Sequence, residues 1–232
     1  MCIRDSWSEV YERSVRLASA ITNADVKPGE VVTIMAPNIP EMFEAHFGVA
    51  MAGAVLNTLN TRLDTDTISY ILEDADSRLL ITDAAFGEAM KTALAQTENK
   101  KIKIIDIIDE QASESASGLR LGEQDYETFL NVADPEFKWQ MPADEWQAMC
   151  LNYTSGTSGR PKGVVYHHRG AYLMAMGTIP VWNMPMHPTY LYVVPLFHCN
   201  GWGHAWMMAI VAGTKICCRK IIAEDILSLI HI

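Results

Sequence analysis

Apolar and polar positions between residues 7 and 108 follow two alternating patterns. In some stretches apolar residues recur every three to four positions, which is the spacing of one face of a helix. Other stretches are short apolar runs rich in β-branched residues, which are typical of buried strands. The predicted elements are helices at 7–21, from Glu41 onward, at 65–75 and at 84–96, and strands at 31–35, 54–57, 78–82 and 101–108. This alternation predicts a parallel sheet with crossover helices.

The alternation breaks at residues 109–147. Residues 110–118 are polar and carry no aromatic side chain, which predicts an exposed loop. A short helix is expected near 125–130. The acids of this region, Asp106 and Asp109 included, are expected to be solvated, and we predict no acid–base pair among them.

The alternation resumes at residue 148, and no internal repeat is present. The expected order is a strand, a Ser/Gly-rich loop, a helix from about Arg169, a strand at 190–195, a helix at 204–212 and a strand at 214–218. The predicted fold class is therefore α/β, with parallel sheets flanked by helices. We expect a first part at 7–147, which includes the exposed loop at 109–147, and a second part at 148–226.

Composition and net charge limit the kinds of ligand that this chain is expected to bind. Its 232 residues are 49% hydrophobic and 20% charged, as in an ordinary globular protein, and its net charge is −10. A nucleic-acid backbone is therefore not an expected partner, and anionic ligands must be attracted by local groups. No apolar run has the length of a membrane span, and the first residues lack a secretory pattern, so we expect a cytoplasmic protein.

The five cysteines predict neither a metal site nor disulfide bonds. Their number is odd, two are adjacent, and no pair has the spacing of zinc ligands. We expect reduced and mostly buried thiols.

The most distinctive chemistry lies in a loop after the apolar run at 148–151. It combines hydroxyls, glycines and one lysine in the sequence Tyr153-Thr154-Ser155-Gly156-Thr157-Ser158-Gly159-Arg160-Pro161-Lys162-Gly163. Glycines let backbone N–H groups turn toward an anion, hydroxyls add donors, and a lysine adds a mobile positive charge. In an acidic chain this predicts a site for a nucleotide triphosphate. A solvated Ser/Gly turn is the alternative interpretation.

The spacing of this loop excludes the P-loop of nucleotide triphosphatases. That motif has a glycine, four further residues, and then Gly-Lys-Ser/Thr. Gly156 and four further residues lead to Pro161, whereas Gly159 and four further residues lead to Val164. Lys162 is also followed by Gly163 rather than by a hydroxyl residue.

Residues 153–165 instead resemble the signature loop of the adenylate-forming enzymes, the superfamily of acyl-CoA synthetases, luciferases and peptide-synthetase adenylation domains. Residues 27–29, 36–41, 53–60 and 142–146 are similar to further patterns of acyl-CoA synthetases, so the resemblance covers most of the chain. It implies that the chain is part of the large N-terminal domain of such an enzyme.

The resemblance also implies the substrates and the residues that bind them. A carboxylic acid would react with ATP to give an acyl-adenylate and pyrophosphate, and CoA would then form the thioester. The phosphates would be wrapped by Thr154, Ser155, Gly156, Thr157, Ser158 and Gly159. Lys162 would pair with them as a catalytic point charge. Thr157, or its neighbour Ser158, would contribute to a Mg²⁺ site.

A second segment, residues 195–204, carries the expected acyl site. By resemblance, His198 would orient the substrate carboxylate, and Asn200, Gly201, Trp202 and Gly203 would belong to the substrate pocket. The alternative is a buried histidine beside a core tryptophan. His46 and the cations His167, His168 and Arg169 receive no assigned role, and the methionines between 174 and 208 are expected in the core or in the acyl pocket.

Parts of the family pattern do not follow residue 220. They are the adenine-binding and Tyr-Gly-x-Thr-Glu region, a ribose-binding aspartate and a C-terminal catalytic lysine. Residues 1–6 and 227–232 do not match the family and resemble translated adapter sequence, so we expect non-native ends and a fragment that is inactive alone.

The expected parent is an ATP-dependent acyl-CoA ligase for medium- or long-chain fatty acids or related apolar acids. An amino-acid adenylation domain and a non-catalytic nucleotide-binding module are the alternatives. Neither the particular acid nor the oligomeric state follows from the sequence.

Overall fold

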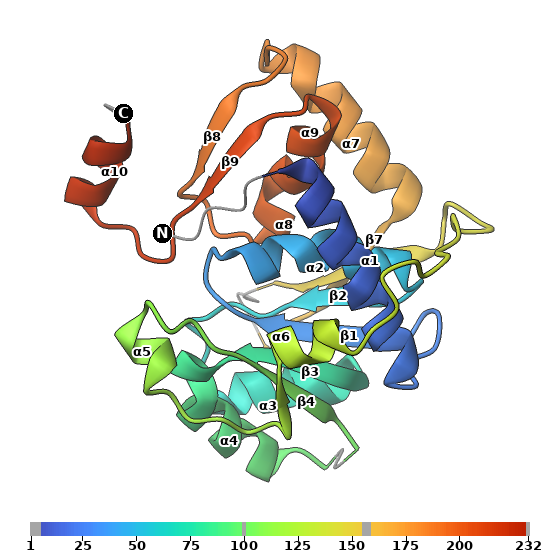
Figure 1. The fold of residues 1–232 in the computed structure, drawn as a ribbon. Helices are drawn as coiled ribbons and strands as arrows, with labels where there is room; N and C mark the ends of the chain where they lie inside the picture. The colour runs from blue at the N-terminus through green and yellow to red at the C-terminus, as the bar shows by residue number, and fades with distance from the viewer. Residues whose placement is uncertain (1–5, 99–100, 155–158, 231–232) are drawn as a thin grey trace.

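The computed structural model describes residues 6–98, 101–154 and 159–230, which are built around a seven-stranded sheet (Figure 1). The strands lie in the order β5-β4-β3-β1-β2-β6-β7, and only β6 and β7 pair antiparallel. Their bounds are β1 Val31–Met35, β2 Val55–Thr58, β3 Ser77–Asp83, β4 Lys103–Ile107, β5 Gln124–Asp125, β6 Ala148–Tyr153 and β7 Gly163–His167. The predicted α/β class is confirmed, with a mostly parallel sheet.

Helices cover both faces of this sheet. The helices α1 (Trp7–Asn23), α2 (Pro40–Met51) and α6 (Tyr126–Asn131) pack on one face, while α3 (Thr65–Asp74) and α4 (Gly87–Gln96) pack on the other. The side chains of β3 alternate between two buried clusters, because successive residues of a strand point to opposite faces. Leu79 and Ile81 belong to the cluster under α1 and α2, whereas Leu80 belongs to the cluster under α3 and α4.

A smaller layer lies beside the main sheet. It consists of two parallel strands, β8 (Thr189–Tyr192) and β9 (Thr214–Cys217), together with α7 (His168–Val181), α8 (Cys199–Trp202) and α9 (His204–Ile210). Figure 1 shows this layer above α2, with α10 (Ala223–Ile230) projecting to one side. No helix in the described ranges is long and apolar enough to cross a bilayer.

Most of the predicted helices and strands form, and the structure adds one strand and one strand pairing that the sequence did not indicate. Strand β7 directly follows the Ser/Gly-rich loop and was not predicted, so this loop connects two antiparallel strands. The predicted strands at 190–195 and 214–218 form, but they pair with each other rather than joining the main sheet. The described cysteines are free, and three of them, Cys150, Cys217 and Cys218, are buried, as predicted.

Residues 109–147 are largely exposed but not without structure. They contain α5 (Ser113–Ala116), β5 and α6, with η1 (Ala84–Phe86) packed nearby. Tyr126, Phe129 and Leu130 bury their side chains against the main core. The short helix predicted near 125–130 is therefore confirmed, and it anchors the region by an i, i+3, i+4 apolar pattern.

The expectation that Asp106 and Asp109 are solvated was wrong. Asp106 is 1% exposed, and its carboxylate accepts hydrogen bonds from the backbone N–H groups of Leu121 and Gly122 at 2.9 and 2.8 Å. Asp109 pairs with Arg219 at 3.4 Å. Both acids have partners distant in sequence, which hydrophobic periodicity does not report.

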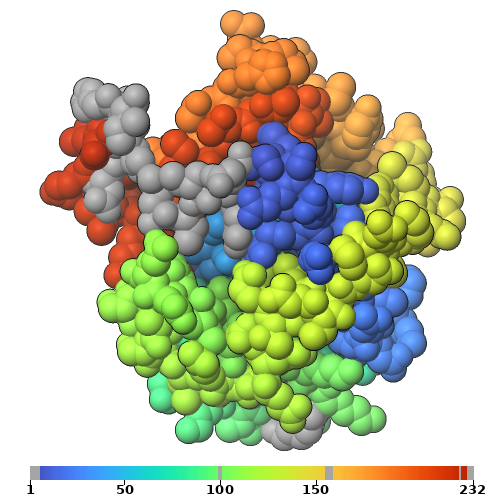
Figure 2. All heavy atoms as spheres, viewed as in Figure 1, coloured from blue at the N-terminus to red at the C-terminus, as the bar shows by residue number. Residues whose placement is uncertain are grey.

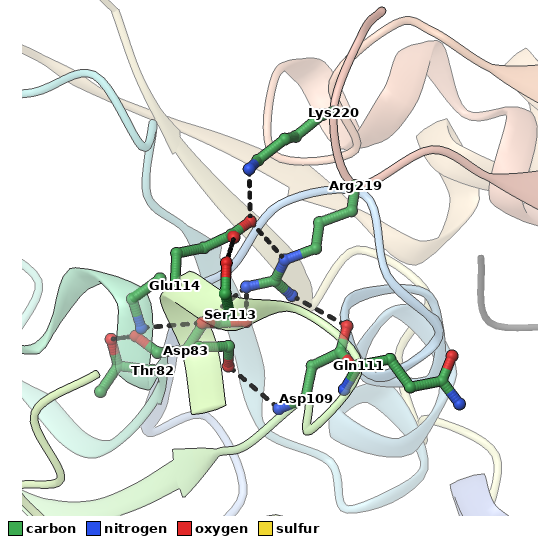
Figure 3. A network of polar contacts seen from close by, with 10 residues as sticks. Thr82, Asp83, Asp109, Gln111, Ser113, Glu114, Arg219 and Lys220 are labelled. Carbon is green, nitrogen blue, oxygen red and sulfur yellow. Dashed lines mark hydrogen bonds and ion pairs between the residues drawn. The ribbon is translucent and has the colours of Figure 1, made fainter. Parts of the chain in front are cut away.

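Arg219 joins the segment after β9 to the first part of the chain (Figure 3). Its guanidinium lies 2.8 Å from the Asp83 carboxylate and 3.3 Å from that of Glu114. Lys220 adds a contact to Glu114 at 3.0 Å. Because Asp83 is fully buried, this arginine supplies the charge that makes a buried carboxylate tolerable.

Candidate functional site

An open cavity of about 750 Å³ lies where β2 and β6 end. In parallel sheets, ligands bind beyond the carboxyl ends of the strands, so this is the expected position for a site. The described residues that line it come from β2 and the loop before α3, from β6 and β7, and from the segment before α8. They include Thr58, Asn60, Arg62, Asn152, Tyr153, Thr154, Gly159, Pro161, Tyr166, Phe197, His198 and Cys199.

Thr154, Gly159 and Pro161, in the described ends of the Ser/Gly-rich loop, line this cavity. Thr154 and Lys162 hold the base of the loop, because the Thr154 N–H donates to the Lys162 carbonyl at 3.0 Å. Gly159 lines the cavity with a φ of +132°, a conformation that L side chains rarely adopt. The Lys162 side chain is exposed, and within the described ranges it has no ion-pair partner. The predicted phosphate contacts at Ser155, Gly156, Thr157 and Ser158 lie outside the described residues.

Two contacts tie the base of the loop to α3. The Tyr153 hydroxyl donates to the carboxylate of Asp74 at 2.7 Å, and the Tyr70 hydroxyl donates to the same group at 3.2 Å. The guanidinium of Arg160 lies 5.1 Å from the centre of the Tyr70 ring. These contacts fix both arms of the loop against one helix, so its described ends hold a defined position at the cavity.

His198 lies in the lining of the same cavity. It precedes α8, and its backbone N–H donates to the Pro195 carbonyl at 3.1 Å. The imidazole is exposed and belongs to the cavity lining. The alternative of a buried structural histidine is thereby excluded for His198. It fits His204 instead, which is 1% exposed and stacks on Tyr190.

A second, apolar cavity of about 410 Å³ adjoins the first. Tyr166 and Cys199 line both cavities, so they form the border between them. Val165, Ala171, Met174 and Trp202 complete most of the lining of the smaller cavity. Sequence reasoning identified Trp202 and Met174 but missed Tyr166 and Cys199, whose only signal was their proximity to the two motifs.

The other residues predicted for the pocket, Asn200, Gly201 and Gly203, follow the border residue Cys199 in the chain. Asn200 and Gly201 are buried, and Asn200 bonds to Asn152 inside the protein. Gly203 has a φ of +72°, and a Cβ placed there would lie 2.1 Å from the Met174 Cε. Gly203 thus permits the close approach of Met174 that shapes the apolar cavity. Direct contact of Asn200, Gly201 and Gly203 with a substrate remains a prediction.

Two of the three basic residues after the loop, His167 and Arg169, have structural partners. His167 Nδ1 accepts from the Gly170 N–H at 2.9 Å and so caps α7, and its ring lies 4.6 Å from that of Trp146. Arg169 pairs with Glu145. Burial lowers the pKa of His168, which favours a neutral ring. The described residues contain no group of three side chains able to hold a metal ion.

The fold and the paired cavities define a class: an α/β protein with a glycine-rich loop beside an apolar pocket at the carboxyl edge of a sheet. Sequence comparison identifies the family. The sequence model of the AMP-binding enzyme family matches residues 3–231, and the chain belongs to that family of adenylate-forming enzymes.

Named relatives agree with this assignment. The chain is 44% identical to an acetate/butyrate–CoA ligase, AAE7, peroxisomal, of Arabidopsis thaliana and 42% identical to a 2-methylpropanoate–CoA ligase, CCL4, of Humulus lupulus. Each match covers 97% of this chain and 41% of the relative, so the chain spans less than half the length of these proteins.

Solved structures show the same fold. A fatty acyl CoA synthetase of Mycobacterium tuberculosis superposes with a TM-score of 0.83 at 22% identity, covering 98% of this chain and 42% of that one. The inhibitor-bound N-terminal domain of FACL13 from the same organism superposes with a TM-score of 0.82 at 23% identity, covering 96% of this chain and 52% of that one. These similarities support the predicted α/β architecture.

Proposed function

We propose that this chain is part of an ATP-dependent acyl-CoA ligase that activates an apolar carboxylic acid. The observation that carries the proposal is the adjacency of the two cavities. The larger cavity, lined by the glycine-rich loop at Thr154 and Gly159, suits a triphosphate, and the apolar cavity that shares Tyr166 and Cys199 with it suits the tail of an acid. His198 lines the larger cavity next to the border residue Cys199, where a carboxylate and the α-phosphate would meet.

The reaction would proceed in two displacements. A carboxylate oxygen attacks the α-phosphorus of ATP, the bond from that phosphorus to the bridging oxygen breaks, and pyrophosphate leaves. The CoA thiol then attacks the acyl carbonyl, a proton leaves the sulfur, and AMP departs with the carbonyl–oxygen bond pair. Adenylation is needed because oxide and hydroxide are poor leaving groups, whereas AMP is a good one.

The residues of this chain would act mainly in the first displacement. Negative charge grows on the departing pyrophosphate, so donors of the loop and the Lys162 ammonium would stabilise the transition state. The loop donors are Thr154 and Gly159, together with Ser155, Gly156, Thr157 and Ser158. The His198 imidazole would donate a hydrogen bond to the acid and hold one carboxylate oxygen toward phosphorus.

Magnesium is the implied metal, and it would neutralise phosphate charge when bound with ATP. The described residues offer no cage of three protein ligands, which agrees with a metal held largely by the nucleotide. Thr157 is the proposed protein contact.

The chemistry of the apolar cavity favours an acyl acid over an amino acid. Its described lining contains no Asp or Glu that could pair with a substrate ammonium group. The names of the relatives refer to acetate, butyrate and 2-methylpropanoate, which favour a short acid. The preference for medium or long chains expected from the sequence therefore stays a prediction. The cytoplasmic location also stays a prediction, since the AAE7 relative is named as peroxisomal.

Thioester formation by the full-length enzyme tests this proposal. The enzyme would be incubated with ATP, Mg²⁺, CoA and one acid from a series that runs from acetate to palmitate, with amino acids as a parallel series. We expect acyl-CoA with at least one apolar acid and AMP in equal amount. Adenylation of amino acids alone would support the adenylation-domain alternative, and nucleotide binding without turnover would support a non-catalytic module.

A further inference from the structure

Five consecutive residues after His198 adopt a left-handed backbone. Their φ values are +48° at Cys199, +53° at Asn200, +59° at Gly201, +58° at Trp202 and +72° at Gly203. Only two of them are glycines, and L residues with a Cβ rarely adopt this conformation in succession. Such a strained turn persists only where the surroundings hold it, and strain of this kind concentrates at functional sites.

Buried hydrogen bonds hold the N-terminal half of this left-handed turn. On its N-terminal side, the Thr58 hydroxyl lies 2.7 Å from the carbonyl oxygen of Phe197 and 3.1 Å from Oδ1 of Asn152. Within the turn, Asn152 Nδ2 donates to Asn200 Oδ1 at 2.8 Å. Thr58, Asn152 and Asn200 are 5%, 8% and 0% exposed, so water competes little for these bonds.

A further side chain fixes the strand end that leads into the turn. Asn38 Nδ2 donates to the carbonyls of Tyr192 and Val194 at 2.8 and 3.0 Å, and its Oδ1 accepts from the Leu196 N–H at 2.7 Å. All these bonds reach the segment from the main sheet or the loop next to it. The segment is thus attached to the sheet on both sides of His198.

Within the described ranges the His198 ring makes no such hydrogen bond. It is exposed, and the contacts that place it are made by the backbone on either side. Cys199 and Trp202, which line the apolar cavity, belong to the same turn. The conformation of the turn therefore sets both the position of the imidazole and the shape of the pocket beside it.

We propose that Thr58, Asn152 and Asn200 are positioning residues that hold the left-handed turn and thereby aim His198 at the carboxylate of the acid. This inference rests on the proposed ligase function. Asn200 acts here through Asn152 and the backbone, not through contact with substrate. The proposed phosphate loop is a separate part of the cavity lining, so loss of this network should affect use of the acid much more than use of ATP.

The first test compares matched variants of the full-length enzyme in acid-dependent ATP–pyrophosphate exchange. Thr58→Val removes the hydroxyl but keeps the shape, and Asn200→Gly removes the side-chain bond while tolerating the left-handed backbone. Each is expected to lower kcat/KM for the acid about tenfold, the effect of losing one or two buried hydrogen bonds. KM for ATP should stay within about twofold, well below one factor of ten in affinity.

Thr33→Val is the matched control. Thr33 is a fully buried threonine of the same sheet, bonded to Ser77 and Asn57, and its hydrogen bonds do not include Asn152, Phe197 or Asn200. It should lower the melting temperature without changing KM for the acid. Thr58→Ser, which keeps the hydroxyl, should retain activity. If Thr58→Val and Asn200→Gly lower only the melting temperature, as the control does, or if Thr58→Ser loses as much activity as Thr58→Val, the proposal is overturned.

A second measurement does not depend on turnover and so separates this inference from the proposed function. In proton–carbon NMR spectra of the same enzyme, the Cε1–H signal of His198 should shift or broaden in Thr58→Val and Asn200→Gly and stay unchanged in Thr33→Val. An unchanged His198 signal in the first two variants would refute the positioning role. Absence of exchange in the wild type, with the expected NMR changes, would refute only the ligase function.

Discussion

His46, the buried histidine of α2, makes the free energy of unfolding of this protein depend on pH. The size of this effect follows from the pKa of His46. His46 is 1% exposed and packs against the ring of Trp206, with 6.0 Å between ring centres. Its Nδ1 lies 2.8 Å from the Met42 carbonyl, which can only accept, so Nδ1 carries the proton. Nε2 has no hydrogen-bond partner in the described part of the chain. Burial lowers the pKa of His46 from 6.5 to about 4.

The sign of the effect follows from which state binds the proton. Below pH 6.5 the unfolded chain protonates His46 while the folded protein keeps it neutral, so stability falls as pH drops toward 4. The full difference corresponds to roughly 3 kcal/mol at 1.36 kcal/mol per pKa unit. Between pH 7.5 and pH 5.0 the loss assigned to His46 is about 2 kcal/mol.

Urea unfolding at these two pH values measures this loss. In His46→Gln the side chain no longer titrates, so the drop in the free energy of unfolding should be about 2 kcal/mol smaller than in the wild type. Comparing drops rather than absolute values cancels the constant cost of the substitution. Equal drops in the wild type and His46→Gln would refute the reasoning.

Three further substitutions test separate parts of the structure. Arg219→Leu leaves the Asp83 carboxylate buried and uncompensated, so it should lower the free energy of unfolding by about 3 kcal/mol, whereas Arg78→Gln, at a half-exposed pair, should cost under about 1 kcal/mol. Equal losses of unfolding free energy for Arg219→Leu and Arg78→Gln in urea titrations would contradict the role of Arg219 in compensating the buried Asp83 carboxylate. Gly203→Ala should destabilise by about 1–3 kcal/mol through the left-handed φ and the clash with Met174, and an unchanged melting temperature would contradict that packing. Trp202→Ala should alter the chain-length preference in a thioester assay more than KM for ATP, and an unaltered acid profile would remove this residue from the pocket.

The parts of the fold that sequence predicted are those written in local patterns. Strands such as β1 (Val31–Met35) and helices such as α3 (Thr65–Asp74) follow directly from hydrophobic periodicity. Strand β7 escaped prediction because its valines, Val164 and Val165, are exposed and follow the loop motif directly.

Structural features that depend on residues distant in the sequence were either not predicted or wrongly predicted. Asp106 and Asp109 were expected in solvent, but their partners lie 15 and 110 positions away, at Leu121 and Arg219. The cavity likewise gathers Thr58 and Tyr166 from separate strands. Motifs could suggest His198 as a site residue, but not the left-handed turn that presents it, since Cys199 and Trp202 favour other backbone conformations.

The central claim is that the loop at 154–162 and the cavity beside it support adenylation of a carboxylic acid. The most direct test is acid-dependent ATP–pyrophosphate exchange by the full-length enzyme and by its Lys162→Ala variant. We predict exchange in the wild type and at least about a tenfold lower rate in the variant, because a charge-assisted contact to the leaving pyrophosphate is lost. Equal exchange rates in the two proteins would contradict the role of Lys162. Absence of exchange in the wild type with every apolar acid would contradict the claim itself.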